Sequence, residues 1–293
     1  MNAPLTPLSF ALFALLAAAL TPRAGAQPAA TGGDDPTAAM AHEHAHDAPT
    51  PSPAVGRSGG AEKVKAETVA YGKAGDETFH GYLARPEGAK KGGPAVLLIH
   101  EWWGLNDNIR DIARQLASHG YLALAVDVYH AKSASTPDEA QGLMRGVMAH
   151  PEAAEENLRQ AVHYLHAKAG AGKVGVVGWC FGGGWSLQTA LLVPDGVQAV
   201  VMYYGRPELD RAKLAKLQAP LLGNFGEQDQ GIKPEGVRQF EALLKELGKS
   251  ADIKFYPGAG HAFANPSGGN YVKAAADDAW QRTLAFFDAH LKS

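Results

Sequence analysis

Short apolar runs alternate with amphipathic segments along the chain from residue 61 onward. Six of these runs predict strands that are buried on both faces, over residues 94–99, 121–126, 174–177, 199–203, 220–225 and 253–256. Apolar positions at helical spacing predict helices over residues 109–116, 153–168, 185–192, 237–247 and 274–291. Because parallel strands need crossover connections, the alternation predicts an α/β fold with a mostly parallel central sheet and helices on both faces.

Two further segments show the alternating pattern of half-buried strands. Residues 64–71 and 78–84 are separated by the turn-forming run 72–76, so they predict an antiparallel hairpin at one edge of the sheet.

The first 60 residues differ in composition from the rest. Residues 1–26 contain an apolar run over 8–20 and end in Ala24-Gly25-Ala26, which predicts a secretory signal peptide and a periplasmic or secreted protein with no membrane insertion after its removal. Residues 27–60 hold no aromatic residue, leucine or isoleucine, and we expect a disordered tether. The α/β domain is then residues 61–293. Histidines 42, 44 and 46 alternate in the tether; we favour a solvated stretch over loose binding of a transition metal.

Charge and cysteine content narrow the function classes. The 293-residue chain has a formal net charge of −3 and no basic cluster, which argues against nucleic acid or an anionic membrane surface as a partner. A single cysteine excludes an internal disulfide. No cofactor or metal motif is apparent in the domain, so we expect no cofactor, and we expect a monomer whose partner is a small molecule.

The single cysteine has the sequence surroundings of a catalytic nucleophile. Cys180 follows an apolar strand and lies between Gly178 and Gly182, which is the pattern of a nucleophile elbow with sulfur in place of oxygen. The glycines permit the sharp strand-to-helix turn, and the helix N-terminus favours the thiolate. We therefore expect a sulfur that is presented at the surface of a cleft instead of being buried.

A base and an orienting carboxylate follow Cys180 at later strand ends. His261 comes after the last predicted strand in a glycine-rich loop, and Asp229 comes after the strand before it, with Glu227 as a competitor for the acidic role. The chain order of nucleophile, acid and base is that of α/β-hydrolases. The sequence thus predicts a Cys180, His261 and Asp229 triad.

The loop after the first parallel strand completes the predicted site. It reads Glu101-Trp102-Trp103-Gly104, and in the hydrolase fold this loop donates one oxyanion-hole N–H. We expect the backbone N–H groups of Trp102 and Phe181 to converge on the oxyanion, with the indole of Trp103 as an apolar wall.

These residues together resemble the dienelactone hydrolases (carboxymethylenebutenolidases), from about Glu67 to the C-terminus. The resemblance is carried by the runs 100–104, 178–183, 203–205, 226–229 and 260–263. It implies an α/β-hydrolase fold with Cys180 as nucleophile, His261 as base and Asp229 as its orienting carboxylate. It also implies that Glu101 contacts the resting thiol and changes partner when substrate enters.

The substrate-binding residues match this family less closely. Asn265 stands where the dienelactone-cleaving members have an arginine that grips the substrate carboxylate, and Arg145 is our candidate for another cation. Tyr204 and Phe263 complete the expected substrate site. We therefore expect an exported hydrolase that cleaves a small ester or lactone through a cysteine thioester. The alternative is a non-enzymatic protein that holds a small apolar ligand on a hydrolase scaffold.

Overall fold

The structure is a computed structural model of the chain, and it describes His44, Pro49 and residues 63–293. These residues belong to one compact unit, Asp34–Ser293. The predicted signal peptide over 1–26 lies outside the described residues, as does the predicted tether over 27–60 apart from His44 and Pro49. Within the part that is described, no helix is long and apolar enough to cross a membrane.

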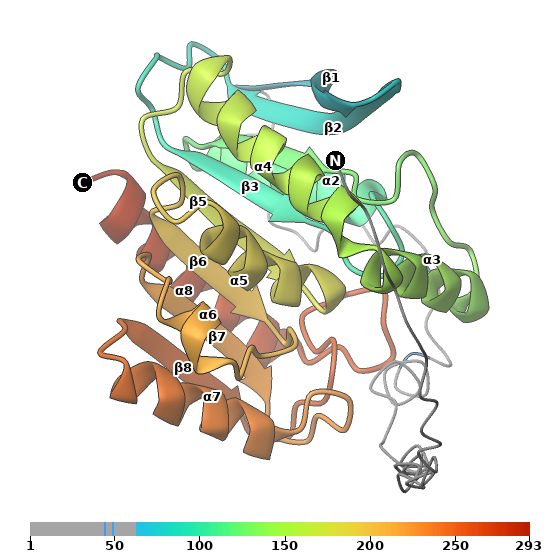
Figure 1. Ribbon diagram of the computed structural model, residues 1–293, viewed down its shortest axis with the longest axis vertical. Coiled ribbons are helices and arrows are strands. Elements are labelled where there is room, and N and C mark those ends of the chain that lie inside the picture. The colour runs from blue at the N-terminus through green and yellow to red at the C-terminus, as the bar shows by residue number, and fades with distance from the viewer. Residues whose placement is uncertain (1–43, 45–48, 50–62) are drawn as a thin grey trace, which may run out of the picture. The chain divides into compact units, whose positions relative to one another are not determined.

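Eight strands form one sheet in the order β1-β2-β4-β3-β5-β6-β7-β8 (Figure 1). The hairpin of β1 and β2 is antiparallel, β2 also pairs antiparallel with β4, and all pairs from β4 to β8 are parallel. The mostly parallel α/β sheet and its edge hairpin are confirmed. The strand bounds are β1 Val64–Ala74, β2 Glu77–Pro86, β3 Ala95–Ile99, β4 Leu122–Val126, β5 Val174–Trp179, β6 Ala199–Tyr203, β7 Leu221–Gly226 and β8 Ala251–Tyr256.

Helices cover both faces of the sheet. In Figure 1, α4, α5 and α7 lie on the viewer's side, and α8 lies behind β5 to β7. Helix α2 shares the face of α8, because Lys292 at the end of α8 donates to the carbonyl of His119 at the end of α2. The helix bounds are α2 Asp107–Ser118, α3 Pro137–Ala149, α4 Pro151–Ala167, α5 Phe181–Leu192, α6 Arg211–Leu214, α7 Pro234–Glu246 and α8 Lys273–Leu291.

One strand departs from the predicted burial. The central strands β3 to β7 are buried along their length, but Ile253, Lys254 and Phe255 in β8 are only half-buried. The expectation that all six apolar runs are buried on both faces is wrong for β8, because this strand pairs only with β7 and forms the edge of the sheet.

The topology brings the predicted site residues to one edge of the sheet. Strands β3, β5, β6, β7 and β8 are parallel, so their carboxyl ends all lie at the same edge. The loops that follow these ends carry the predicted site residues, which is where open α/β sheets place their functional groups.

Candidate active site

A strained turn joins β5 to α5 at Cys180. Cys180 is the N-cap of α5 and has φ 55° and ψ −116°, a backbone conformation that side chains rarely adopt. A Cβ at Gly178 would lie 2.0 Å from the carbonyl oxygen of Gly182, and one at Gly182 would lie 2.3 Å from that of Ile99. Only glycine fits both positions, so the predicted elbow is present.

The sulfur of Cys180 is buried, contrary to the prediction. Cys180 is 1% exposed, and the imidazole of His44 lies next to it, with Nε2 3.9 Å from Sγ. His44 is itself 1% exposed and packs against Trp102, at 4.6 Å between ring centroids. The expectation that His44 belongs to a solvated stretch is therefore wrong for this side chain. The thiol at the elbow therefore lies next to the polar imidazole rings of His44 and His261.

His261 and Asp229 form a buried pair beside Cys180. The Nδ1 of His261 is 2.8 Å from Oδ2 of Asp229, and both side chains are fully buried. The other oxygen of Asp229 accepts from the backbone N–H of Ile232 at 2.7 Å. Glu227, the competing acid, is exposed and forms an ion pair with Arg238 at 3.5 Å. The geometry therefore assigns the histidine-orienting position to Asp229.

Backbone contacts hold the loops of this pair together. The N–H of Glu227 donates to the carbonyl of Tyr256 at 3.0 Å, and the N–H of Gln228 donates to that of Ala259 at 2.9 Å. A Cβ at Gly226 would meet the carbonyl oxygen of Ala259 at 2.5 Å. The two loops are thus tied at the ends of β7 and β8, which fixes the imidazole relative to the carboxylate.

The charges at the site favour a thiolate beside an imidazolium. Burial, the largest influence, raises the pKa of the Cys180 thiol, but attraction to His261 and then His44 outweighs it and lowers the pKa to about 6. Burial lowers the pKa of His261, yet the Asp229 carboxylate and the Cys180 sulfur outweigh it and hold that pKa well above the usual value. Since the two shifts are opposite, the charged pair is the favoured state at neutral pH.

Glu101 is held by two side chains beside this pair. Its Oε2 accepts from Nδ2 of Asn265 at 2.7 Å, and its Oε1 lies 3.5 Å from the hydroxyl of Tyr204. The ring of Tyr204 in turn contacts that of His261, at 5.2 Å between centroids. Glu101 is 4% exposed, so the structure brings its carboxylate into the buried cluster. Its predicted contact with the resting thiol stays a prediction.

The predicted oxyanion donors lie on adjacent segments. Strands β3 and β5 pair with Ile99 opposite Gly178, which places the Trp102 loop next to the elbow. Phe181 is the first residue of α5, so its N–H has no partner within the helix. Among the backbone hydrogen bonds of loops and turns in the described residues, neither Trp102 nor Phe181 donates. Both N–H groups are therefore suited to receive an oxyanion, and this role stays a prediction.

The predicted substrate-binding residues fall into two groups. Trp103, Tyr204 and Phe263 are buried and each lies against another aromatic ring: Trp103 contacts Trp102 at 5.1 Å between centroids, and Phe263 contacts Tyr204 at 5.3 Å. Arg145, in contrast, is exposed on α3. Its assignment to substrate binding stays a prediction.

Sequence reasoning missed two residues of the site. His44 lies far from the triad in sequence, and the only signal for it was the alternating histidine run over 42–46. Asn265 was noted only for the arginine that it replaces, whereas the structure shows it as a partner of Glu101. Its signal was its position four residues after His261.

Comparisons with known proteins indicate the family of this chain. Residues 79–291 match the sequence profile of the dienelactone hydrolase family. Protein usf of Aquifex pyrophilus is 34% identical over 218 residues, which cover 72% of this chain and 93% of that protein. A protein of Saccharolobus solfataricus named "Putative carboxymethylenebutenolidase" is 31% identical over 242 residues, covering 70% of this chain and 91% of that protein.

A solved structure of a dienelactone hydrolase is also similar to this chain. The crystal structure of dienelactone hydrolase from Anabaena variabilis is 26% identical and has a TM-score of 0.60, covering 78% of this chain and 99% of that one. The fold is therefore that of an α/β-hydrolase. Because the family profile matches well over half of the sequence, the chain belongs to the dienelactone hydrolase family.

Proposed function

We propose that this protein is an exported hydrolase that cleaves a small ester or lactone through a thioester on Cys180. The observation that carries the proposal is the juxtaposition of Cys180 with a buried imidazole that Asp229 holds at 2.8 Å. A nucleophile, a base and a carboxylate that orients the base are the parts that acyl transfer requires.

In the first step, the thiolate of Cys180 attacks the carbonyl carbon of the substrate. The N–H groups of Trp102 and Phe181 stabilise the oxyanion, and loss of one such donor typically costs about 10²-fold or more in rate. Nε2–H of His261 then gives its proton to the leaving alkoxide as the carbon–oxygen bond breaks. The products of this step are an alcohol and a Cys180 thioester.

In the second step, water hydrolyses the thioester. His261 is now neutral, so its Nε2 takes a proton from water while the oxygen attacks the thioester carbonyl. Collapse of the adduct breaks the carbon–sulfur bond, releases the carboxylic acid and restores the thiolate and imidazolium. Asp229 keeps Nδ1 protonated throughout, and this fixes Nε2 as the nitrogen that faces the substrate.

Two features narrow the expected substrate. A thiolate is a good leaving group as well as a good attacker, so activated or strained esters should be cleaved faster than plain alkyl esters. Asn265 is neutral and its amide already binds Glu101, so it provides no positive charge for a substrate carboxylate. We therefore favour uncharged aryl esters and lactones over the carboxylate-bearing lactones that need a cationic grip.

Export is proposed from the sequence alone, on the apolar run and small residues within 1–26. Intact-mass measurement of the protein recovered from the periplasm or culture medium tests this part. Loss of the first 26 residues supports export, and an uncleaved chain confined to the cytoplasm contradicts it.

The catalytic part is tested with full-length protein, a chelator and an aryl acetate. Wild-type protein should hydrolyse the ester with turnover, Cys180→Ala should reduce the rate to background, and His163→Ala, which changes an exposed histidine on α4, should match the wild type. Equal turnover by Cys180→Ala contradicts the mechanism. Absence of turnover from every aryl ester and lactone in a panel favours the non-enzymatic binding protein.

A further inference from the structure

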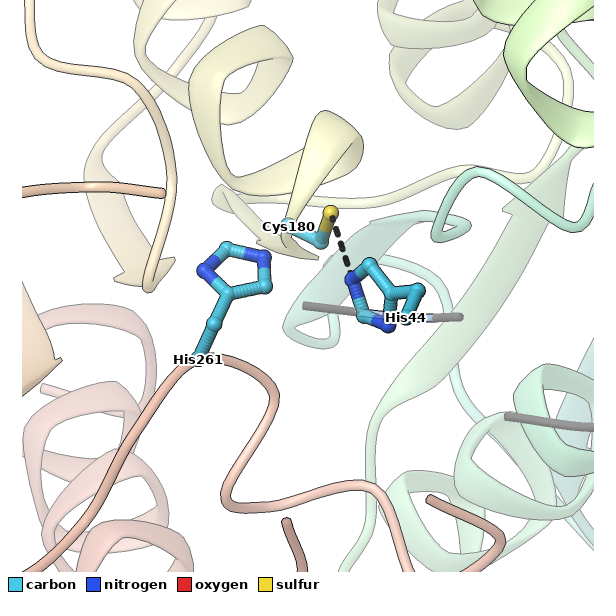
Figure 2. Close-up of side chains that lie close together, drawn as sticks. All are labelled: His44, Cys180 and His261. Carbon is cyan, nitrogen blue, oxygen red and sulfur yellow. Dashed lines mark hydrogen bonds between the residues drawn. The ribbon is translucent and has the colours of Figure 1, made fainter. Parts of the chain in front are cut away.

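Three buried side chains with metal-binding atoms lie close together at the turn between β5 and α5. The Sγ of Cys180 and a ring nitrogen of each of His44 and His261 all lie within 4.8 Å of one another. The three residues are at most 1% exposed. Figure 2 shows Cys180 with an imidazole on either side, one from each end of the described chain. Cys180 and His261 react in the steps of acyl transfer, whereas His44 takes part in none of these steps.

We propose that His44, Cys180 and His261 form a binding site for one Zn(II) ion. One thiolate and two imidazoles are a ligand set that suits zinc, with the fourth tetrahedral position left for water or another exchangeable ligand.

The distances between the donor atoms fit a tetrahedral ion after a small adjustment. Zinc bonds of about 2.3 Å to sulfur and about 2.05 Å to nitrogen at a tetrahedral angle separate sulfur from nitrogen by about 3.6 Å and the nitrogens by about 3.4 Å. The Sγ of Cys180 already lies 3.9 Å from Nε2 of His44. Because all separations are at or below 4.8 Å, displacements of the three donor atoms by about 1 Å bring them to bonding distances.

His261 is prepared for this role by Asp229. Its Nδ1 is engaged with the carboxylate, so Nε2 is the nitrogen that remains for a metal, and Nε2 is buried without a hydrogen bond to any described residue. A carboxylate behind a histidine is the usual outer partner of zinc-bound imidazoles, which it orients and makes more basic. Zinc binding would displace the proton from Nε2 of His261, because a metal-bound imidazole nitrogen carries no proton.

The consequence for activity rests on the proposed function, although binding itself does not. A zinc ion held by Cys180 and His261 occupies both the nucleophile and the base, so the loaded protein should not hydrolyse esters. Coordination also uses one electron pair of the thiolate, which makes the sulfur less reactive toward oxidants. The site thus provides a reversible resting form, released when a chelator or competing ligand removes the ion.

The test is a titration of full-length, metal-free protein with Co(II), which takes zinc's geometry and shows a thiolate-to-metal absorption band. We expect one Co(II) per chain, displacement by Zn(II), and no displacement by Mg(II) or Ca(II), which prefer oxygen ligands. Cys180→Ala should abolish the band. His44→Ala should weaken Zn(II) binding by about 10-fold or more, since even loss of an outer partner costs that much.

The matched control is His42→Ala, which removes a neighbouring histidine of the same run and should change affinity by less than about 2-fold. Absence of the band, equal affinity in His44→Ala and wild type, or binding that survives Cys180→Ala but is lost in His42→Ala would each overturn the proposal. Because the band needs no substrate, a protein that binds Co(II) through Cys180 but cleaves no ester would refute the proposed function alone. Active protein without the band would refute the metal site alone.

Discussion

The pH dependence of Cys180 alkylation follows directly from the geometry of the site. The attraction of His261 and His44 lowers the pKa of the thiol to about 6, against about 8.5 for a free cysteine. The thiolate is the reactive form, so the labelling rate should rise as pH passes upward through 6 and then level off. Replacement of His261 by alanine removes the principal attraction, while burial continues to oppose the charge. The midpoint in His261→Ala should therefore move upward, to about 8.5 or higher.

The magnitude can be worked out from these two values. At pH 6 about half of Cys180 is thiolate, compared with roughly 0.3% of a free cysteine, a ratio of about 150. Nucleophilicity falls with pKa at a slope of about 0.4–0.5, so a difference of about 2.5 in pKa costs roughly 10- to 20-fold. The net advantage is about 10-fold at pH 6, roughly 2-fold at pH 7, and a disadvantage at pH 8. Limited access of the reagent to the buried sulfur lowers the labelling rate by the same factor at pH 6, 7 and 8, so the midpoint of the pH–rate curve does not change.

The assay is iodoacetamide labelling between pH 4.5 and 9.5, followed by mass spectrometry. Cys180 is the only cysteine, so every alkylated thiol reports on this site. The control is His163→Ala, whose midpoint should equal that of the wild type. A wild-type midpoint near 8.5, or the same midpoint in His261→Ala and wild type, would refute the reasoning.

Three further predictions concern the supports of the site. Gly178→Ala puts a Cβ 2.0 Å from a carbonyl oxygen, so urea denaturation should show an unfolding free energy lower by at least about 2 kcal/mol. The control is Gly142→Ala on α3, where the added Cβ has nothing within 4 Å, and this change should raise the unfolding free energy by up to about 1 kcal/mol. Equal effects of the two substitutions would contradict the packing argument. Asp229→Asn should reduce kcat by about 10³-fold or more in the aryl-ester assay without loss of folded protein, whereas a kcat near that of the wild type would remove the carboxylate from the mechanism. Asn265→Asp places a second carboxylate against Glu101, which raises the pKa of the pair in the folded state. Stability relative to wild type should then be lost as pH rises from 5 to 8, and a loss that is constant with pH would refute the contact.

Features that depend on residues close together in the chain could be predicted from the sequence. Glycines around Cys180 predicted the elbow, because a Cβ at either position would strike backbone atoms. Asp229 and His261 were found because each follows an apolar strand, and parallel strands bring their carboxyl ends to one edge. Helix α3 was not among the helices predicted from apolar spacing, and it has only two buried residues, Ala140 and Met144. Its N-terminal signals, the Thr136 cap and Pro137, were the better evidence.

Contacts between distant segments were beyond the reach of the sequence. The exposure of β8 depends on its position at the edge of the sheet, which hydrophobicity along one strand does not encode. The contact of Cys180 with His44 joins residues that are 136 positions apart, and His44 comes from a stretch that lacks the apolar content expected of packed structure. The bond from Asn265 to Glu101 likewise joins residues 164 positions apart.

A rapid-quench experiment with an aryl ester, analysed by intact-mass and peptide mass spectrometry, detects the proposed Cys180 thioester directly. We expect acid quenching during turnover to trap one acyl group per chain on the peptide containing Cys180, and His261→Ala to slow both the formation and the hydrolysis of this thioester. Steady turnover with no acylated Cys180, or acylation of another residue that forms and decays at the turnover rate, would contradict the proposed mechanism.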